Sequence, residues 1–110
     1  MKKTGCEIEN ENGTLRVKLL GEIDHHSCAY LREEIDKAMF RSRCDTVVMD
    51  LCAVTFMDSA GLGLILGRYA KITELGGRLV CVNPSLDIDK ILRIAGVRKL
   101  ITVKEERKII

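Results

Sequence analysis

The feature that most constrains the fold is a regular alternation of strand-like and helix-like segments along the chain. Residues 6–11 and 15–19 alternate apolar and polar side chains, and they flank Asn12-Gly13, a pair preferred in two-residue hairpin turns. Three amphipathic helical segments then alternate with three short strand segments. Such alternation is typical of right-handed crossovers that join parallel strands. The sequence therefore predicts an α/β fold of order β-β-α-β-α-β-α-β, a mixed sheet opened by a β-hairpin with helices packed against it.

Apolar spacing and terminating residues give the expected elements. In chain order these are a helix over 28–39, a strand at 45–51, a helix over 59–75, a strand at 79–82, a helix opened by Pro84-Ser85 and closed by Gly96, and a strand at 100–103. The continuous run Val47-Val48-Met49 indicates a central strand covered on both faces. Gly21 is expected to end the second strand, and Gly76-Gly77 to stop the second helix.

Size and charge restrict the classes of function. The chain of 110 residues fits one compact domain over 1–110. Its net charge of +2 comes from 18 basic and 16 acidic residues, with no basic stripe and no interleaved aromatic residues, so direct DNA binding is not expected. The end at 104–108 mixes both signs of charge and is expected to be solvated.

Cysteine usage and hydropathy bear on the compartment. The five cysteines are an odd number without CxxC spacing, which favours buried free thiols over disulfides or a zinc site. The first five residues are not followed by an apolar run, so no signal peptide is expected. No segment approaches the ~18 apolar residues of a membrane span. These observations favour a cytoplasmic protein without a membrane association.

The second helix is unusually rich in small residues. Gly61, Gly63 and Gly67 fall within it, although an interior glycine costs a helix about 1 kcal/mol against alanine. Ala60, Gly63, Gly67 and Ala70 form one stripe, which permits close packing of the helix backbone. Alternatively, glycines at the helix start leave N–H groups open to another chain or a phosphate. Gly61, in the first turn, is the stronger functional candidate.

Asp58 and Ser59 stand where this helix begins, and both residue types are good helix N-caps. Phe56 and Met57 precede them in a chain that is 4% aromatic. A hydroxyl at this point would be exposed beside apolar side chains at the positive end of a helix dipole. The fold would tolerate a phosphate there.

These residues carry a resemblance to a known family. The matching elements are Gly21-Glu22-Ile23-Asp24-His25-His26, Asp50-Leu51, Phe56-Met57-Asp58-Ser59-Ala60-Gly61-Leu62-Gly63 and Leu66-Gly67-Arg68-Tyr69. The chain resembles the STAS domain of bacterial anti-sigma factor antagonists, in particular the sporulation branch that antagonises the anti-sigma-F factor. The match runs from residue 21 to about residue 82, and the order of strands and helices fits the family.

The resemblance implies a regulator that binds proteins and is not an enzyme. In this family the serine at the position of Ser59 is phosphorylated by the anti-sigma factor, which is an ATP-dependent serine kinase. The unphosphorylated protein binds the anti-sigma factor and frees a sigma factor, and a separate phosphatase resets the switch. Ala60 follows the acceptor where many relatives have a second hydroxyl. No cofactor is implied, and the implied partner-binding residues are Asp24, His25, Phe56, Met57, Asp58, Ser59, Ala60, Gly61, Leu62 and Gly63.

Four alternatives remain open at this point. A serine hydrolase could use Ser59 with His25 or His26, but the nucleophile elbow requires Gly-x-Ser-x-Gly and Met57 occupies its first position. A metal site could use Asp24, His25, His26 and Cys28, without a distant partner motif. A nucleotide could bind at Gly61-Leu62-Gly63, which lacks the Lys-Ser/Thr of a phosphate-binding loop. Finally, the chain could be a STAS module of another regulatory or transporter-associated complex.

Overall fold

The computed structural model describes residues 4–106. Within this range the predicted element order is confirmed, with one additional short 3-10 helix, η1. The elements are β1 (Gly5–Glu11), β2 (Thr14–Ile23), α1 (His25–Ser42), β3 (Thr46–Met57), α2 (Ser59–Glu74), β4 (Arg78–Val82), α3 (Leu86–Ile94), η1 (Val97–Lys99) and β5 (Thr102–Lys104).

The strands form one five-stranded mixed sheet in the order β1-β2-β3-β4-β5. The β1–β2 pair is the predicted antiparallel hairpin, turning at Asn12-Gly13, where both residues have positive φ. The remaining neighbours are parallel. Parallel neighbours end at the same edge of the sheet, so helices that follow β2 and β3 start side by side.

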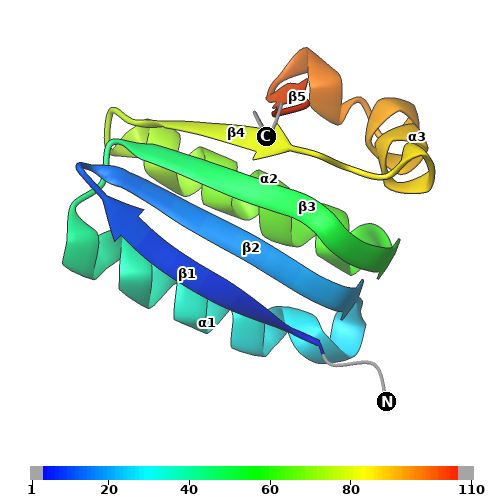
Figure 1. Ribbon diagram of the computed structural model, residues 1–110, viewed down its shortest axis with the longest axis horizontal. Helices are drawn as coiled ribbons and strands as arrows, with labels where there is room; N and C mark the ends of the chain where they lie inside the picture. Colours follow the sequence, from blue (N-terminus) through cyan, green and yellow to red (C-terminus); the bar gives the residue numbers. More distant parts are fainter. Residues whose placement is uncertain (1–3, 107–110) are drawn as a thin grey trace, which may run out of the picture.

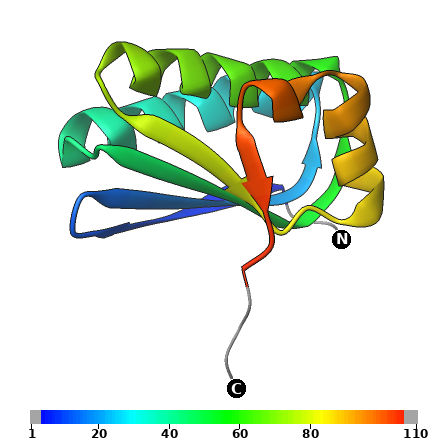
Figure 2. The same ribbon diagram turned by 90° about the horizontal axis from the view of Figure 1, so that it is seen from above.

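Helices α1 and α2 lie next to each other on one face of the sheet, and α3 lies at its end (Figures 1 and 2). The core sits between this helical layer and the sheet. Its largest fully buried side chains are Leu15, Leu19, Ile23, Leu31, Ile35, Met49, Leu51, Ile65, Ile72, Ile88, Leu92 and Ile101. In the part of the chain described here, no helix is long and apolar enough to cross a membrane.

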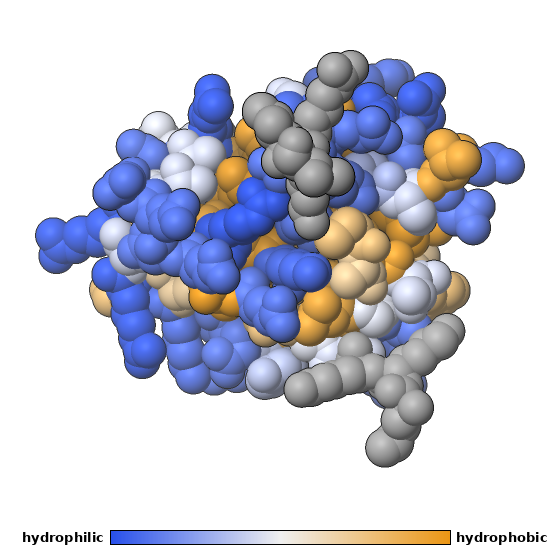
Figure 3. Space-filling view, in the orientation of Figure 1, coloured by the Kyte–Doolittle hydropathy of each residue, from blue (hydrophilic) through white to orange (hydrophobic). Residues whose placement is uncertain are grey.

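The expectation that the central strand is covered on both faces is wrong. In β3, Val47 and Met49 are fully buried under the helices, whereas Thr46 and Val48 are only half-buried on the opposite face. That face is shown in Figure 3, where hydrophilic side chains gather over much of the surface. The run of apolar residues suggested helices on both faces, but Val48 lies beside Val80 of the neighbouring strand, and no helix of the described range covers this face.

Two other boundaries differ from the prediction. Gly21 does not end β2; it lies inside the strand at φ 81°, where the pairing with β3 changes register, and the strand continues to Ile23. The bulge needs this left-handed backbone conformation, which glycine adopts without a steric penalty. Strand β3 likewise runs on to Met57, so both strands reach the helix starts directly.

Candidate functional site

The first turns of α1 and α2 meet at one edge of the sheet. Ile23 and Met57, the last residues of β2 and β3, are paired across the two parallel strands. Each is followed by an aspartate that begins the next helix. The Asp58 backbone N–H donates to the Ile23 carbonyl over 3.4 Å, which ties the two junctions together.

Asp24 caps α1. Its carboxylate accepts hydrogen bonds from the backbone N–H groups of Ser27, over 3.1 Å, and His26, over 2.9 Å. The Ser27 hydroxyl accepts the Asp24 N–H in return, which completes a capping box. These hydrogen bonds hold the pKa of Asp24 below its ordinary value, so the carboxylate is a fixed negative charge at this edge.

Asp58 is the N-cap of α2, which leaves Ser59 as the first helical residue. One Asp58 carboxylate oxygen accepts the backbone N–H groups of Ala60, over 2.9 Å, and Gly61, over 3.1 Å. The expectation of bare N–H groups at this helix start is therefore wrong for these two positions. A phosphate added to Ser59 would compete with the Asp58 side chain for them.

The Ser59 side chain is exposed on the first turn. Its hydroxyl forms no hydrogen bond with any residue between 4 and 106. A hydroxyl that caps a helix is held by the backbone, whereas this one is free to react or to contact another molecule. The structure thus separates the two roles that the sequence left combined: Asp58 caps and Ser59 projects.

The two apolar residues before the cap differ in position. Phe56 is 47% exposed and offers its ring at the surface, whereas Met57 is 3% exposed and packs in the core. Met57 was predicted to contact a partner, but its side chain has almost no surface to offer. It acts from inside, as a support for the start of α2.

The glycines of α2 also divide into two groups. A Cβ atom at Gly61 would lie 2.7 Å from the Ile23 carbonyl oxygen and 2.6 Å from Met57 Cγ, so glycine is required for packing here. Close packing therefore accounts for the glycine at position 61 without a binding role for its backbone. At Gly63 and Gly67 a Cβ would meet nothing within 4 Å. Their missing side chains leave space open at the surface.

That space is a hollow between the N-terminal halves of α1 and α2. His25 and Arg32 line it from α1, and Ala60, Gly63 and Gly67 line it from α2. Below them lies Arg68, which is buried and pairs with Asp36 of α1 over 2.8 Å. The hollow brings His25, Ala60 and Gly63 together, as the predicted partner surface requires. Arg32 was missed, because neither its spacing nor its neighbours in sequence mark it.

This arrangement can be compared with known proteins. Residues 6–108 match the STAS domain family, which covers most of the chain. The chain belongs to the STAS domain family.

Its relatives are regulators named for what they antagonise. The STAS domain is 37% identical over 97 residues to an anti-sigma F factor antagonist of Paenibacillus polymyxa, covering 88% of this chain and 83% of the relative. It is 32% identical over 95 residues to the anti-sigma-B factor antagonist of Bacillus subtilis, covering 86% and 84%.

Solved structures of SpoIIAA have the same fold. The unphosphorylated anti-sigma factor antagonist SpoIIAA superimposes with a TM-score of 0.82 at 28% identity, over 94% of this chain and 90% of that one. The phosphorylated form of SpoIIAA, a Bacillus cell fate determinant, gives a TM-score of 0.75 at the same identity, over 94% and 93%. The predicted family and fold are confirmed.

The geometry of the STAS domain disfavours the other chemistries considered for this edge. Ser59 donates no hydrogen bond to either histidine, among the residues described, as a nucleophile activated by a base would. The Asp24 carboxylate is occupied by capping, and between residues 4 and 106 no three His, Cys, Asp or Glu side chains gather as a metal site would require. Gly61 is packed against β2 and its N–H is already bonded.

The cysteines only partly match the expectation of buried thiols. No disulfide joins cysteines within residues 4–106; Cys44 and Cys81 are buried, Cys6 and Cys28 are partly buried, and Cys52 is exposed. Burial raises the pKa of the Cys28 thiol, and the nearby carboxylates of Asp58 and Asp24 raise it further. The negative charges of both N-cap aspartates thus act on the same thiol, that of Cys28.

Proposed function

We propose that this STAS domain is an anti-sigma factor antagonist controlled by phosphorylation of Ser59. In its unphosphorylated form it binds an anti-sigma factor that is also a serine kinase, and a sigma factor is released. Phosphate on Ser59 ends the binding, and a phosphatase restores it. The domain itself acts by binding and catalyses no reaction.

The observation that carries the proposal is the state of the Ser59 hydroxyl. It is exposed, it makes no hydrogen bond to the rest of residues 4–106, and it follows the exposed Phe56 by three residues at the edge where two helices start. A kinase needs an acceptor of this kind, accessible without unfolding. The proposed docking surface includes Ser59 and the residues around it, namely Asp24, His25, Phe56, Ala60 and Gly63. The residues that support this surface from beneath are Met57, Asp58, Gly61 and Leu62.

Charge explains how the phosphate would switch binding. Phosphorylation adds about 1.5 to 2 negative charges beside the carboxylates of Asp58 and Asp24. Each added charge ~4 Å from a like charge costs about 1 to 4 kcal/mol, depending on local screening. A partner surface built to accept the acidic caps and a neutral hydroxyl would lose at least about a hundredfold in affinity, since every 1.4 kcal/mol is tenfold.

The same modification should leave the fold intact. Ser59 is the first residue of α2, where the helix dipole favours negative charge. No hydrogen bond of the domain depends on its hydroxyl in the described range. Binding and folding are therefore separable at this position.

Incubation with the cognate anti-sigma kinase and ATP should place one phosphate on the protein, at Ser59. Ser59→Ala should accept none and bind the kinase constitutively, and Ser59→Asp should bind at least about a hundredfold more weakly at similar stability. Calorimetry of binding and mass spectrometry of the product measure both effects. Incorporation of phosphate into Ser59→Ala would overturn the assignment.

Ser85 provides the matched control, because it is another exposed serine at a helix start. Its hydroxyl oxygen accepts the Ile88 N–H over 3.2 Å, so Ser85→Ala should cost about 1 kcal/mol of stability and change neither phosphate incorporation nor affinity.

The choice of anti-sigma factor can be tested in the same way. The identity to the anti-sigma F antagonist, 37%, exceeds that to the anti-sigma-B antagonist, 32%, which supports a partner of the anti-sigma-F type. If the domain bound an anti-sigma-B kinase more tightly, or bound neither kinase, it would instead be a STAS module of a different complex.

A further inference from the structure

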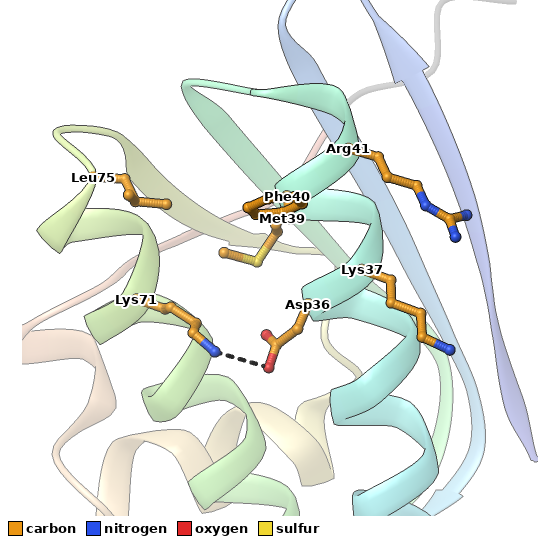
Figure 4. A pocket seen from close by; sticks show the side chains of 7 residues that line it. All are labelled: Asp36, Lys37, Met39, Phe40, Arg41, Lys71 and Leu75. Atoms are coloured by element: carbon orange, nitrogen blue, oxygen red, sulfur yellow. Dashed lines mark hydrogen bonds and ion pairs between the residues drawn. The ribbon is translucent and has the colours of Figure 1, made fainter.

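A second surface lies at the opposite ends of α1 and α2 from Ser59. The C-terminal turns of the two helices expose a groove, here called the distal groove, that is lined by Met39, Phe40, Arg41, Lys71 and Leu75 (Figure 4). A continuation past Phe40 adds Arg43 and Cys44. Nothing in the proposed phosphorylation switch uses these residues.

The centre of the distal groove is apolar. Phe40 is 85% exposed and Leu75 is 72% exposed, and the two approach the groove from different helices with Met39 between them. Large apolar side chains that face one another across a concave surface are typical of protein-binding sites. Leu86 and Ile94, also exposed, are carried by α3 alone and have no such opposing helix.

The edges of the distal groove are basic. Lys71 lies on α2, and Lys37 and Arg41 lie on the outer side of α1 (Figure 4). The one acidic lining residue, Asp36, already pairs with Lys71 over 3.2 Å and with the buried Arg68 over 2.8 Å. Arg41 and Arg43 form no ion pair with any described residue, and Lys37 has only an exposed partner. The groove thus carries excess positive charge on both sides of an apolar centre.

We propose that the distal groove docks an acidic amphipathic segment of a partner protein. An apolar side chain of that segment inserts between Phe40 and Leu75, and its carboxylates lie against Lys71 on one side and Arg41 on the other. A helix with apolar residues at spacings of three and four and with glutamates between them meets both requirements. The surface is separate from Ser59, so the inference does not depend on the proposed switch.

The probe is a synthetic helical peptide of about 16 residues with leucine or phenylalanine at positions i, i+3, i+4 and i+7 and glutamate at most others. Titrated into the ¹⁵N-labelled full chain, it should give saturable shifts confined to residues 36–44 and 71–76. The double variant Phe40→Ser/Leu75→Ser should weaken binding at least tenfold, because truncation of central apolar anchors removes most of a small interface's affinity. Arg41→Glu should weaken it as well, and added salt should reduce the affinity.

Two controls keep the outcome decisive. Ile94→Ser removes an equally exposed apolar side chain from α3 and should leave the affinity unchanged. A peptide with the same apolar residues and lysine in place of glutamate should not bind. Equal binding of both peptides, shifts elsewhere, or no binding would overturn the proposal. So would concentration-dependent dimerisation in sedimentation that Phe40→Ser/Leu75→Ser abolishes, since the occupant would then be a second copy of this chain.

Discussion

Gly61 and Gly67 lie on the same helix, but a methyl group would meet different surroundings at the two positions. At Gly61 it would overlap the backbone oxygen of Ile23, whereas at Gly67 it would enter open space. Gly61→Ala should lower the free energy of unfolding by about 1 to 3 kcal/mol through overpacking. Gly67→Ala should raise it by about 1 kcal/mol, because alanine is the better helix former.

Urea unfolding followed by circular dichroism measures both changes. Gly63→Ala is the control, since its methyl group also enters open space but lies closer to Ser59. It should stabilise the helix like Gly67→Ala. Similar losses of stability for all three variants would show that the start of α2 is no closer to β2 than the rest of the helix.

At this scale the sequence marks the candidate segment more clearly than it assigns a role to each of its residues. The segment from Phe56 to Gly63 was identified because its motif is specific, and Ser59 is exposed as a phosphate acceptor must be. Burial of Met57 and the tight packing of Gly61 could not be predicted, because both depend on where the end of β2 approaches α2. That contact joins residues more than thirty positions apart in the chain.

On the open face of the sheet, one arginine connects two strands with the C-terminal segment. Arg16 of β2 donates to Asp50 of β3 over 2.9 Å and pairs with Glu106 over 2.6 Å. Burial works to raise the pKa of Asp50, but hydrogen bonds from the Cys52 backbone and from Arg16 outweigh it, so the pKa lies below the ordinary 3.8. The hydrogen bond from Arg16 likewise lowers the pKa of Glu106 from 4.5.

These shifts predict a pH-dependent stability. Because both carboxylates have lower pKa values folded than unfolded, their contribution is present above the ordinary values of 3.8 and 4.5 and is lost as the pH falls below them. Arg16→Met should cost about 1 to 3 kcal/mol at pH 7, because it leaves the buried Asp50 carboxylate with fewer donors. The difference from the parent should shrink towards pH 3.

Urea unfolding at a series of pH values measures this difference. Arg78→Met is the control, since Arg78 is exposed on β4 and pairs with no described carboxylate. It should change stability by less than about 0.5 kcal/mol at every pH. A cost for Arg16→Met that stays constant between pH 7 and pH 3 would assign the loss to packing instead of charge.

The element order was predictable because hairpin, helix and strand patterns are local properties of the chain. Which face of the sheet receives the helices is not local, and the run at Val47–Met49 suggested a second layer that does not exist over residues 4–106. Residues 104–106 are exposed, as expected for a solvated end, but the sequence did not predict an ion pair there. Glu106 is tied to Arg16, a contact across ninety positions, and residues 107 and 108 lie outside the described part.

Taken as a whole, the molecule separates its two candidate surfaces along a pair of neighbouring helices. Ser59 stands at the start of α2, and the distal groove lies at the far ends of α1 and α2. The 18 residues of α1 span about 27 Å at 1.5 Å per residue. The ion pair between buried Arg68 and half-buried Asp36 links the two helices between these ends. The two proposed binding surfaces therefore lie at opposite ends of the helical layer.

This layout predicts that the two surfaces act independently. Ser59 and Lys71, a residue of the distal groove, are twelve residues apart on α2, which is about 18 Å at 1.5 Å per residue. A charge at Ser59 is therefore about two Debye lengths from the groove, since the Debye length is about 8 Å at physiological ionic strength. Ser59→Asp should therefore change the affinity of the acidic peptide for the distal groove by less than about twofold, because substitutions so far apart are usually additive. Conversely, Phe40→Ser/Leu75→Ser should leave binding of the anti-sigma kinase unchanged. Calorimetric titration of each variant with each partner measures all four combinations. The independence of the two surfaces would be contradicted by a tenfold effect of Ser59→Asp on peptide affinity, or of Phe40→Ser/Leu75→Ser on kinase affinity. Either result would mean that α1 and α2 shift against each other when one surface is altered, and that the ion pair between Arg68 and Asp36 couples the two surfaces.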